Sequence, residues 1–114
     1  MIEEAVRRVV CEACEYTYVE NGNNPYAMNG TQVRCPWDDA GDALAALGAW
    51  RKKRVNKRHY DIFSARPEID RFVVVLYEDN VLVGESSGSN LPDAACHAIA
   101  AAWAKMKEAG DANI

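Results

Sequence analysis

The sequence predicts an α+β fold, an α/β/α sandwich in which helices cover both faces of one three-stranded antiparallel sheet. Residues 71–84 contain two apolar runs joined by Asp79-Asn80, a pair that tolerates the positive φ of a tight hairpin turn. Apolar side chains occupy both faces of 72–77, which is typical of a central strand covered on both sides. Three other segments carry apolar residues at helical spacing. The expected order of elements is α-(ββ)-α-β-β-β-α.

The N-terminal third is expected to contain a helix followed by a small hairpin. Apolar residues recur every three or four positions across 2–14, which predicts an amphipathic helix. Residues 15–20 and 31–35 are rich in β-forming side chains and predict two short strands. The residues between them include two Asn-Gly pairs and Pro25, which favour turns. We therefore expect 20–34 to be a mobile loop region.

A second helix is expected to begin at Pro36, because proline is tolerated in a first turn and aspartates follow it. Gly41 and Gly48 interrupt its alanine-rich sequence, and each lowers helix propensity by ~1 kcal/mol relative to alanine. We therefore expect both glycines to mark points of close packing. Trp50 lies on the apolar stripe and is predicted to be buried, whereas Trp37 is predicted to be half-exposed.

The sheet is expected to be built from the residues that follow. Residues 59–64 predict a strand antiparallel to the central one, and 65–70 form the connection between them. The hairpin comes next. With its turn at Asp79-Asn80, Leu76 is expected to face Val83, because side chains alternate along a strand.

The final helix is expected to follow Asn90 or Ser89, either of which suits an N-cap, with Pro92 in the first turn. The tail 111–114 is expected to fray. A chain of 114 residues provides one hydrophobic core, so we expect a single domain spanning 1–114. No apolar run approaches the ~18 residues of a membrane span, and the first residues lack a signal-peptide pattern. These features predict a cytoplasmic protein.

Positive charge is concentrated in one short segment of an otherwise acidic chain. The formal net charge is −4, yet a basic cluster of six residues falls within eight positions: Arg51, Lys52, Lys53, Arg54, Lys57 and Arg58. Its position at a predicted helix end is explained in part by the helix dipole. The cluster is also our candidate partner-binding site, for an acidic protein surface or for phosphates. General nucleic-acid-binding proteins are more often basic overall.

Four cysteines raise the question of a metal site. Cys11, Cys14 and Cys35, with Cys96 or a histidine as the fourth ligand, have the residue types of a zinc site. Zinc ribbons, however, carry two paired knuckles, and here the second pair is missing. The first pair also falls within a predicted helix. We therefore favour reduced, mostly buried cysteines and no metal or other cofactor, and keep a zinc-containing protein as an alternative.

No set of side chains points to catalysis. His97 follows Cys96, but adjacent residues on a helix project ~100° apart and do not face each other. His59 has only Asp61 as an obvious carboxylate to orient it. Acid–base catalysis needs its groups within hydrogen-bond reach of one another. The sequence therefore predicts a protein that is not an enzyme.

Three local patterns together cover nearly the whole chain. They are the N-terminal apolar helix at 2–10, the aspartate-led, alanine-rich segment 36–50 that ends at a tryptophan, and the segment 91–102 with its proline, cysteine and alanines. The chain in this respect resembles the phage ABA-sandwich domain family of small phage-encoded proteins. The resemblance implies an α/β/α sandwich of phage or prophage origin, located in a bacterial host cell. It implies no catalytic residue, because the family brings no established activity.

The order of helix, three strands and alanine-rich helix is also similar to that of a double-stranded-RNA-binding domain. That module needs lysines at the start of its last helix to reach phosphates. The corresponding stretch here, 89–95, contains no cation and one aspartate. The two-sided apolar strand at 72–77 also argues against the open sheet of that module. We therefore disfavour this alternative.

The function expected from the sequence is binding and not catalysis. We expect a small phage or prophage protein that binds a host protein or protein complex, with inhibition of a bacterial defence system as one setting. The first alternative is a nucleic-acid-binding accessory protein that uses the basic cluster, and the second is the zinc-containing protein. The size of the chain, its uneven charge and the lack of a convergent catalytic set support the leading hypothesis.

Overall fold

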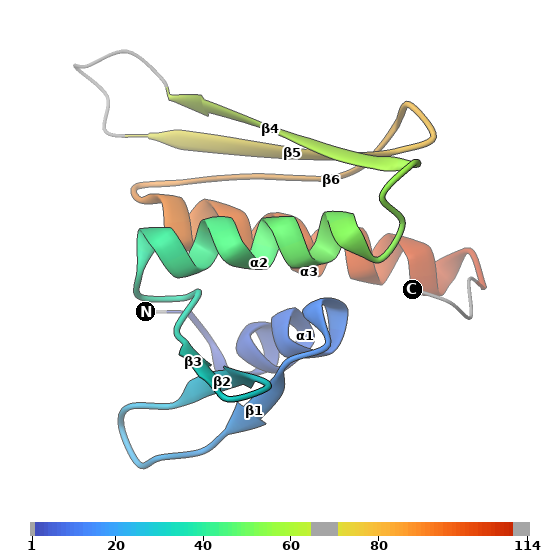
Figure 1. The fold of residues 1–114 in the computed structure, drawn as a ribbon. Coiled ribbons are helices and arrows are strands. Elements are labelled where there is room, and N and C mark those ends of the chain that lie inside the picture. Colours follow the sequence, from blue (N-terminus) through green and yellow to red (C-terminus); the bar gives the residue numbers. More distant parts are fainter. Residues whose placement is uncertain (1, 65–70, 111–114) are drawn as a thin grey trace.

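The computed structural model describes residues 2–64 and 71–110, which form three helices and two three-stranded antiparallel sheets (Figure 1). This confirms the α+β class. The helices are α1 (Glu4–Cys14), α2 (Ala40–Lys52) and α3 (Leu91–Glu108). The first sheet contains β1 (Thr17–Val19), β2 (Tyr26–Asn29) and β3 (Gln32–Arg34), and the second contains β4 (Arg58–Ser64), β5 (Phe72–Glu78) and β6 (Val81–Gly88).

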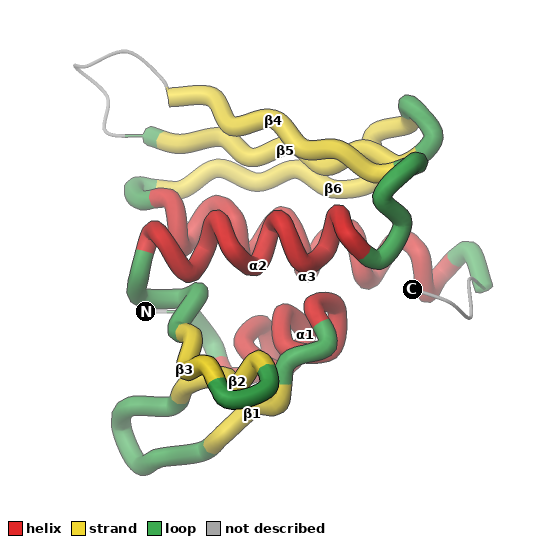
Figure 2. Tube along the Cα trace, in the orientation of Figure 1, coloured by secondary structure: helices red, strands yellow, loops and turns green. Residues whose placement is uncertain are grey.

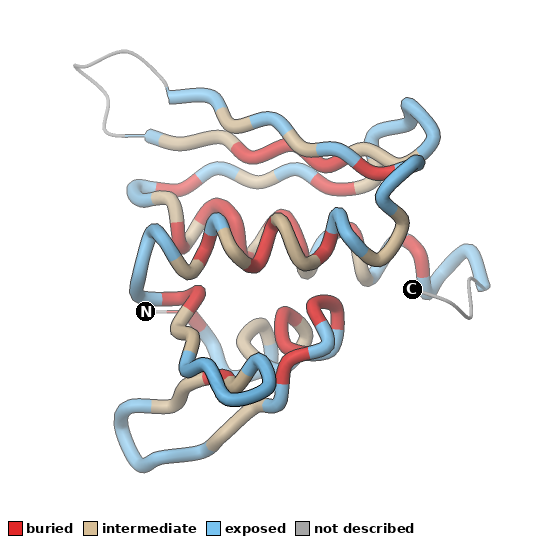
Figure 3. The backbone as a smooth tube through the Cα atoms, viewed as in Figure 1, coloured by how far each residue is buried: buried red, intermediate tan, exposed pale blue. Residues whose placement is uncertain are grey.

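The elements stack in three layers (Figure 2). The β4–β5–β6 sheet forms one layer, α2 and α3 lie side by side beneath it, and α1 with the small β1–β2–β3 sheet forms the third. Helix α3 is central, because it packs against β5, β6, α1 and α2. Buried residues follow these contacts (Figure 3), with Ile99 of α3, Leu47 of α2 and Leu76 of β5 fully enclosed.

The predicted covering of one sheet on both faces is not confirmed. Helices α2 and α3 lie on the same side of the β4–β5–β6 sheet, and no helix of the described residues covers the other side (Figure 1). Phe63, on that open side, is 53% exposed. Val75 on the same side is nonetheless buried, because it lies on the central strand between Asp61 of β4 and Glu85 of β6. Neighbouring strands can therefore bury an apolar residue on the open face of β5, and no helix is needed on that side.

The N-terminal region contains one more strand than expected. Residues 26–29, which the sequence places in a loop, form β2 and pair with both β1 and β3. The second Asn-Gly pair is part of a tight turn, since Asn29 pairs with Gln32 and Gly30 has a φ of +62°. Ala27 at the middle of the sheet is fully buried. The predicted hairpin with one long loop is therefore corrected to a three-stranded sheet.

Helix α2 begins at Ala40, four residues later than predicted. Asp39 is its N-cap, and the Asp39 carboxylate accepts a hydrogen bond from the backbone N–H of Asp42 at 3.2 Å. Pro36 and Trp37 lie in the preceding turn, where both are buried. The indole N–H of Trp37 donates to a backbone carbonyl at 3.1 Å. The expectation of a half-exposed Trp37 is therefore wrong, because a backbone acceptor satisfies its polar atom inside the protein.

The hairpin at the centre of the prediction is present, with one shift in register. Asp79 and Asn80 have φ values of +52° and +63°, as the turn requires. Leu76, however, pairs with Gly84 and not with Val83, because a β-bulge shifts the register just before the turn. This single extra residue brings Gly84 to the face of the sheet that packs on α3.

Close packing occurs at Gly84 and not at the helical glycines. A Cβ at Gly84 would lie 2.5 Å from the carbonyl oxygen of Ala98 and 2.8 Å from the backbone nitrogen of Ala102. A Cβ at Gly48 would have no heavy atom within 4 Å, and one at Gly41 would make only an ordinary 3.5 Å contact. The prediction of close packing at Gly41 and Gly48 is therefore wrong.

The C-terminal half contains α3, which begins at Leu91 after its cap. Asn90 caps α3 by accepting a hydrogen bond from the N–H of Asp93 at 2.8 Å, which confirms one of the two expected caps. The connection 65–70 and the tail 111–114 lie outside the described residues. Among the helices of the described residues, none is both long and apolar enough to cross a membrane.

Candidate partner-binding site at the basic end of helix α2

The basic cluster lies where the chain leaves α2 and enters β4. Helix α2 ends at Lys52, Lys53 is its C-cap, and Arg58 is the first residue of β4. Cations at this position offset the partial negative charge of the carbonyl end of the helix. The structure divides the six residues into two groups. Three of them, Lys53, Arg54 and Arg58, pair with carboxylates, and the other three, Arg51, Lys52 and Lys57, are exposed.

Arg58 is a buried structural residue. It is 3% exposed, and its guanidinium lies over the Trp50 ring at 4.6 Å from the ring centroid. Its Nη1 donates to the Trp50 carbonyl oxygen at 2.9 Å, and its Nε lies 3.5 Å from a carboxylate oxygen of Glu78. Arg58 therefore connects the end of α2 with β5, and its charge is not presented to a partner.

Arg54 and Lys53 also face carboxylates of the protein itself. Arg54 Nη1 lies 2.7 Å from Glu78 Oε1, and both side chains are largely buried. Lys53 Nζ lies 3.8 Å from Glu15, whose own side chain is exposed. Glu78 thus stands between two arginines. The sequence does not indicate this role of Glu78 as a counter-ion, because Glu78 lies 24 residues from Arg54.

The three exposed cations define the surface that remains for a partner. No side chain of the described residues forms an ion pair with Arg51, Lys52 or Lys57. Val55 lies between them in sequence and is 54% exposed. A shallow hollow on this surface is lined by residues 54–57. We call Arg51, Lys52, Lys57 and Val55 the exposed basic surface; it consists of three cations and one apolar side chain within seven positions of the sequence.

The alternation of side chains along β4 indicates from the sequence that Arg58 differs from the other basic residues of the cluster. Side chains alternate along a strand, so Arg58 shares a face of β4 with Tyr60 and Ile62. Both of these residues pack against the hydrophobic core. The alternation therefore places Arg58 on the covered face, and only the ion pairs of Lys53 and Arg54 required the tertiary structure.

The four cysteines are not gathered with other metal-ligating side chains in the described part of the chain. The described residues contain no group of three or more cysteine, histidine or acidic side chains that could hold a metal ion. Cys14 and Cys96 instead donate to backbone carbonyl oxygens at 3.3 and 3.5 Å. Burial raises the pKa of Cys11 and Cys96 to about 12 and that of Cys35 to about 11, so these thiols stay protonated at neutral pH. The zinc alternative has no support in this geometry.

His97 and Cys96 point apart, as their spacing on a helix predicts. Cys96 is fully buried and donates to the Pro36 carbonyl oxygen. His97 is partly exposed, with its Nδ1 at 2.8 Å from the Asp93 carbonyl oxygen and 3.2 Å from the Asp93 carboxylate. The other histidine, His59, stacks on Tyr77 with ring centroids 4.5 Å apart. Within the described residues, neither histidine forms a hydrogen bond with a cysteine.

The structure removes one of the two objections to a double-stranded-RNA-binding domain. The segment from α2 to α3 has both helices on one side of the β4–β5–β6 sheet, and the other side is open (Figure 1). The objection based on a covered sheet is therefore wrong. The objection based on charge holds, because the first turn of α3 contains Asp93 and no cation.

Comparisons of the chain with protein-family models, with curated proteins and with solved structures find no match. The resemblance to the phage ABA-sandwich domain family stays a prediction made from three sequence patterns. The candidate site accordingly rests on its own geometry.

Proposed function

We propose that the protein acts by binding and not by catalysis, and that it binds a host protein or protein complex through the exposed basic surface. The partner is expected to present acidic side chains there, together with an apolar group for Val55. Charged groups at the rim of such a contact mainly set specificity and the rate of association.

One observation carries the proposal. Arg51, Lys52 and Lys57 lie close together in sequence at one end of α2 and have no counter-ion among the described residues, in a chain whose net charge is −4. The same segment pairs Arg54 with Glu78, so carboxylates are used where charge is neutralised internally. An acidic partner would neutralise the remaining three cations.

The setting that we propose is a phage or prophage protein directed against a macromolecule of a bacterial host cell, such as a component of a defence system. The support for this setting is the sequence resemblance, while the support for the binding surface is geometric. The phage setting and the binding surface are therefore supported by different observations.

Capture from bacterial lysate tests the binding surface. The immobilised protein is compared with the double variant Arg51→Gln/Lys57→Gln, and with Lys105→Gln/Lys107→Gln, which removes the same charge from exposed lysines at the end of α3. We expect the wild-type protein and the α3 variant to retain the same host protein at about 150 mM salt, and the α2 variant to lose it. Equal retention by all three, or no retained protein, would contradict the proposal.

The arrangement of α2, β4, β5, β6 and α3 favours a nucleic-acid-binding accessory protein as a second candidate. Its contact would be made by Arg51, Lys52 and Lys57 on phosphates. The measurement is fluorescence anisotropy with labelled RNA and DNA duplexes of about 20 base pairs over a salt series. A contact to about three phosphates predicts a slope near −3 in a plot of log affinity against log salt concentration. Affinity that is unchanged in the Arg51→Gln/Lys57→Gln variant, or absent, excludes this candidate.

A further inference from the structure

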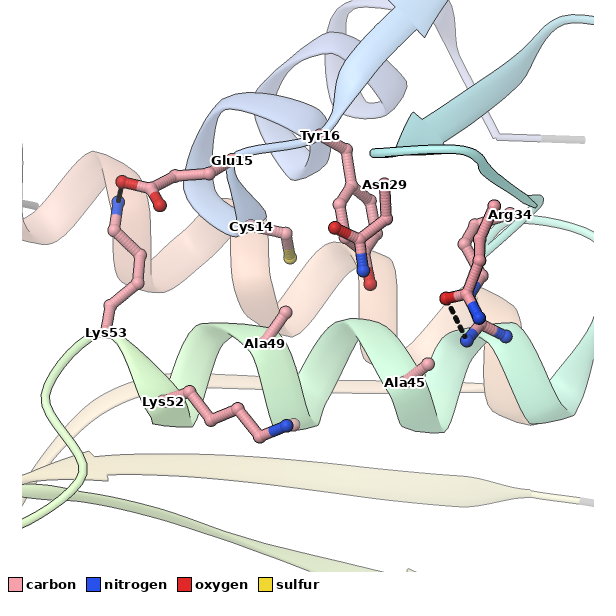
Figure 4. Close-up of a pocket in the computed structure, with 11 residues that line it drawn as sticks. Cys14, Glu15, Tyr16, Asn29, Arg34, Ala45, Ala49, Lys52 and Lys53 are labelled. Atoms are coloured by element: carbon pink, nitrogen blue, oxygen red, sulfur yellow. Dashed lines mark hydrogen bonds and ion pairs between the residues drawn. The ribbon is translucent and has the colours of Figure 1, made fainter.

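A cavity of about 510 Å³ opens between the end of α1, the β2–β3 hairpin and one side of α2 (Figure 4). Its floor is formed by small residues of α2, namely Ala45, Gly48 and Ala49. Tyr16, which follows the end of α1, and Asn29 of β2 project toward this floor. Small-molecule sites in proteins commonly have volumes of about 300–1,000 Å³, so the cavity is large enough for an organic ligand.

The charge of the lining favours an anion. Three cations, Arg34, Lys52 and Lys53, border the cavity, against one carboxylate, Glu15. Lys53 and Glu15 pair loosely at 3.8 Å, whereas Lys52 has no ion pair with a described residue. Arg34 is paired with Asp42 at 3.0 Å, so the net positive charge at the cavity comes from Lys52, in a chain of net charge −4. A cavity whose lining carries a net charge of one sign concentrates ligands of the opposite sign.

Arg34 is held in place by its neighbours. Its Nη1 donates to Asp42 at 3.0 Å and its Nη2 to the Gln32 side chain at 3.1 Å. Asp42 in turn accepts from the backbone N–H of Cys35 at 2.8 Å. Each terminal nitrogen of a guanidinium carries two hydrogens, so Arg34 retains donors for a ligand. A fixed donor of this kind needs little ordering when an anion binds.

Neutral hydrogen-bonding groups complete the lining. The side chains of Tyr16 and Asn29 make no hydrogen bond within the described part of the chain. Burial raises the pKa of Tyr16 to about 12, so its hydroxyl is a donor at neutral pH. Tyr16 is 7% exposed and therefore held in one position by packing. A hydroxyl and an amide without internal partners at a cavity wall are suited to fixing the orientation of a ligand.

Gly48 gives an independent indication. A glycine inside a helix is less stable than alanine by ~1 kcal/mol, and it is normally explained by close packing. At Gly48 a Cβ would meet no heavy atom within 4 Å, so packing does not require glycine. The missing side chain instead leaves the floor of the cavity open between Ala45 and Ala49.

We propose that this cavity binds a small organic anion bearing a phosphate or carboxylate group. The anionic group lies against Arg34, Lys52 contributes its positive charge from the other end of the α2 floor, and a polar part of the ligand meets Tyr16 and Asn29 above that floor. This activity goes beyond the proposed partner contact, which is tested through Arg51 and Lys57. The two proposals can therefore fail separately.

Three probes separate the sources of the anionic group: adenosine 5′-monophosphate, citrate and inorganic phosphate. Each is titrated into the isotopically labelled protein while amide chemical shifts are recorded. We expect at least one of the two organic anions to shift resonances of residues 14–16, 29–34 and 45–53 in a saturable way. Inorganic phosphate is expected to bind more weakly than the preferred organic anion, because it does not span the floor.

Three variants test the geometry with the preferred probe. Gly48→Leu places a side chain in the open space and is expected to abolish binding. Tyr16→Phe removes only a hydroxyl and is expected to weaken binding about tenfold, as is Lys52→Gln. Lys57→Gln is the matched control, because this exposed lysine does not line the cavity, and it is expected to bind like the wild type.

Thermal unfolding checks that the variants are folded. Gly48→Leu is expected to retain the wild-type fold, because leucine is a strong helix former and a Cβ at this position has space around it. The proposal is overturned if no probe shifts cavity resonances in the millimolar range, or if Tyr16→Phe and Lys52→Gln bind as tightly as the wild type. Shifts confined to residues 54–57 would overturn it as well, since they would indicate general attraction to the exposed basic surface.

Discussion

Arg58 places a full positive charge in the interior, between the Trp50 ring and the Glu78 carboxylate. Such a residue is stabilising only while its hydrogen bonds and counter-charge are kept, because an unpaired buried charge is costly. Arg51, seven positions earlier, has the same chemistry but is exposed. The effect of removing an arginine in this segment is therefore set by burial and not by residue type.

Arg58→Ala is expected to lower the free energy of unfolding by about 3 kcal/mol, because it removes the contact with Trp50 and leaves Glu78 with fewer partners. The measurement is urea unfolding followed by tryptophan fluorescence. Arg51→Ala is the matched control, with an expected change within about 0.5 kcal/mol. Equal effects of the two substitutions would show that Arg58 is not a structural residue in solution.

At the scale of elements, the contact between β6 and α3 depends on one glycine. The β-bulge before the turn brings Gly84 onto α3, where backbone atoms leave no space for a side chain. Gly48 in α2 has the opposite environment, with open space next to its Cα. The same substitution is therefore expected to have opposite effects at these two positions.

Gly84→Ala is expected to destabilise the protein by about 2 kcal/mol, because its Cβ would force β6 and α3 apart. Gly48→Ala is expected to stabilise it by about 0.5–1 kcal/mol through helix propensity alone. Thermal and urea unfolding of both variants measure the difference. Destabilisation by Gly48→Ala would mean that its surroundings are more crowded than the structure shows.

At the scale of the whole molecule, helices α1 and α3 both contribute cysteine thiols to the core. Cys11 and Cys14 of α1 and Cys96 of α3 are buried, and burial raises the pKa of each of these thiols above the ordinary value of 9.0. A raised pKa in the folded state means that the unfolded chain loses these protons first. The contribution of these thiols to the free energy of unfolding is therefore fully present below pH 9. It is lost as the pH rises from 9 toward 12.

The expected result is a free energy of unfolding that is constant between pH 7 and pH 8 and falls above pH 9, by at most about 1.4 kcal/mol per pH unit for each thiol. Urea unfolding at several pH values under reducing conditions measures it. Cys96→Ala removes one titrating group, so its stability is expected to fall less steeply with pH. Identical slopes for this variant and the wild type would exclude Cys96 as a source of the effect.

Much of the fold could be predicted from local patterns. The central hairpin, the Asn90 cap and the burial of Trp50 depend on neighbouring residues, and the structure contains all three. The β2 strand and the start of α2 could not be predicted as well, because Asn-Gly and proline are compatible with both loops and regular elements. Of the candidate site, the position of the cations could be predicted, but their ion pairs could not.

The sequence by itself determined the α+β class, the long helices, the central hairpin and the concentration of positive charge at the end of α2, because each of these depends on periodicity or composition over a short span. Only the tertiary structure decided that both helices cover one face of the sheet, that Glu78 neutralises Arg54, and that Gly48 lies beside a cavity. Each of these depends on residues far apart in the chain, and their distances are set by packing of the whole core.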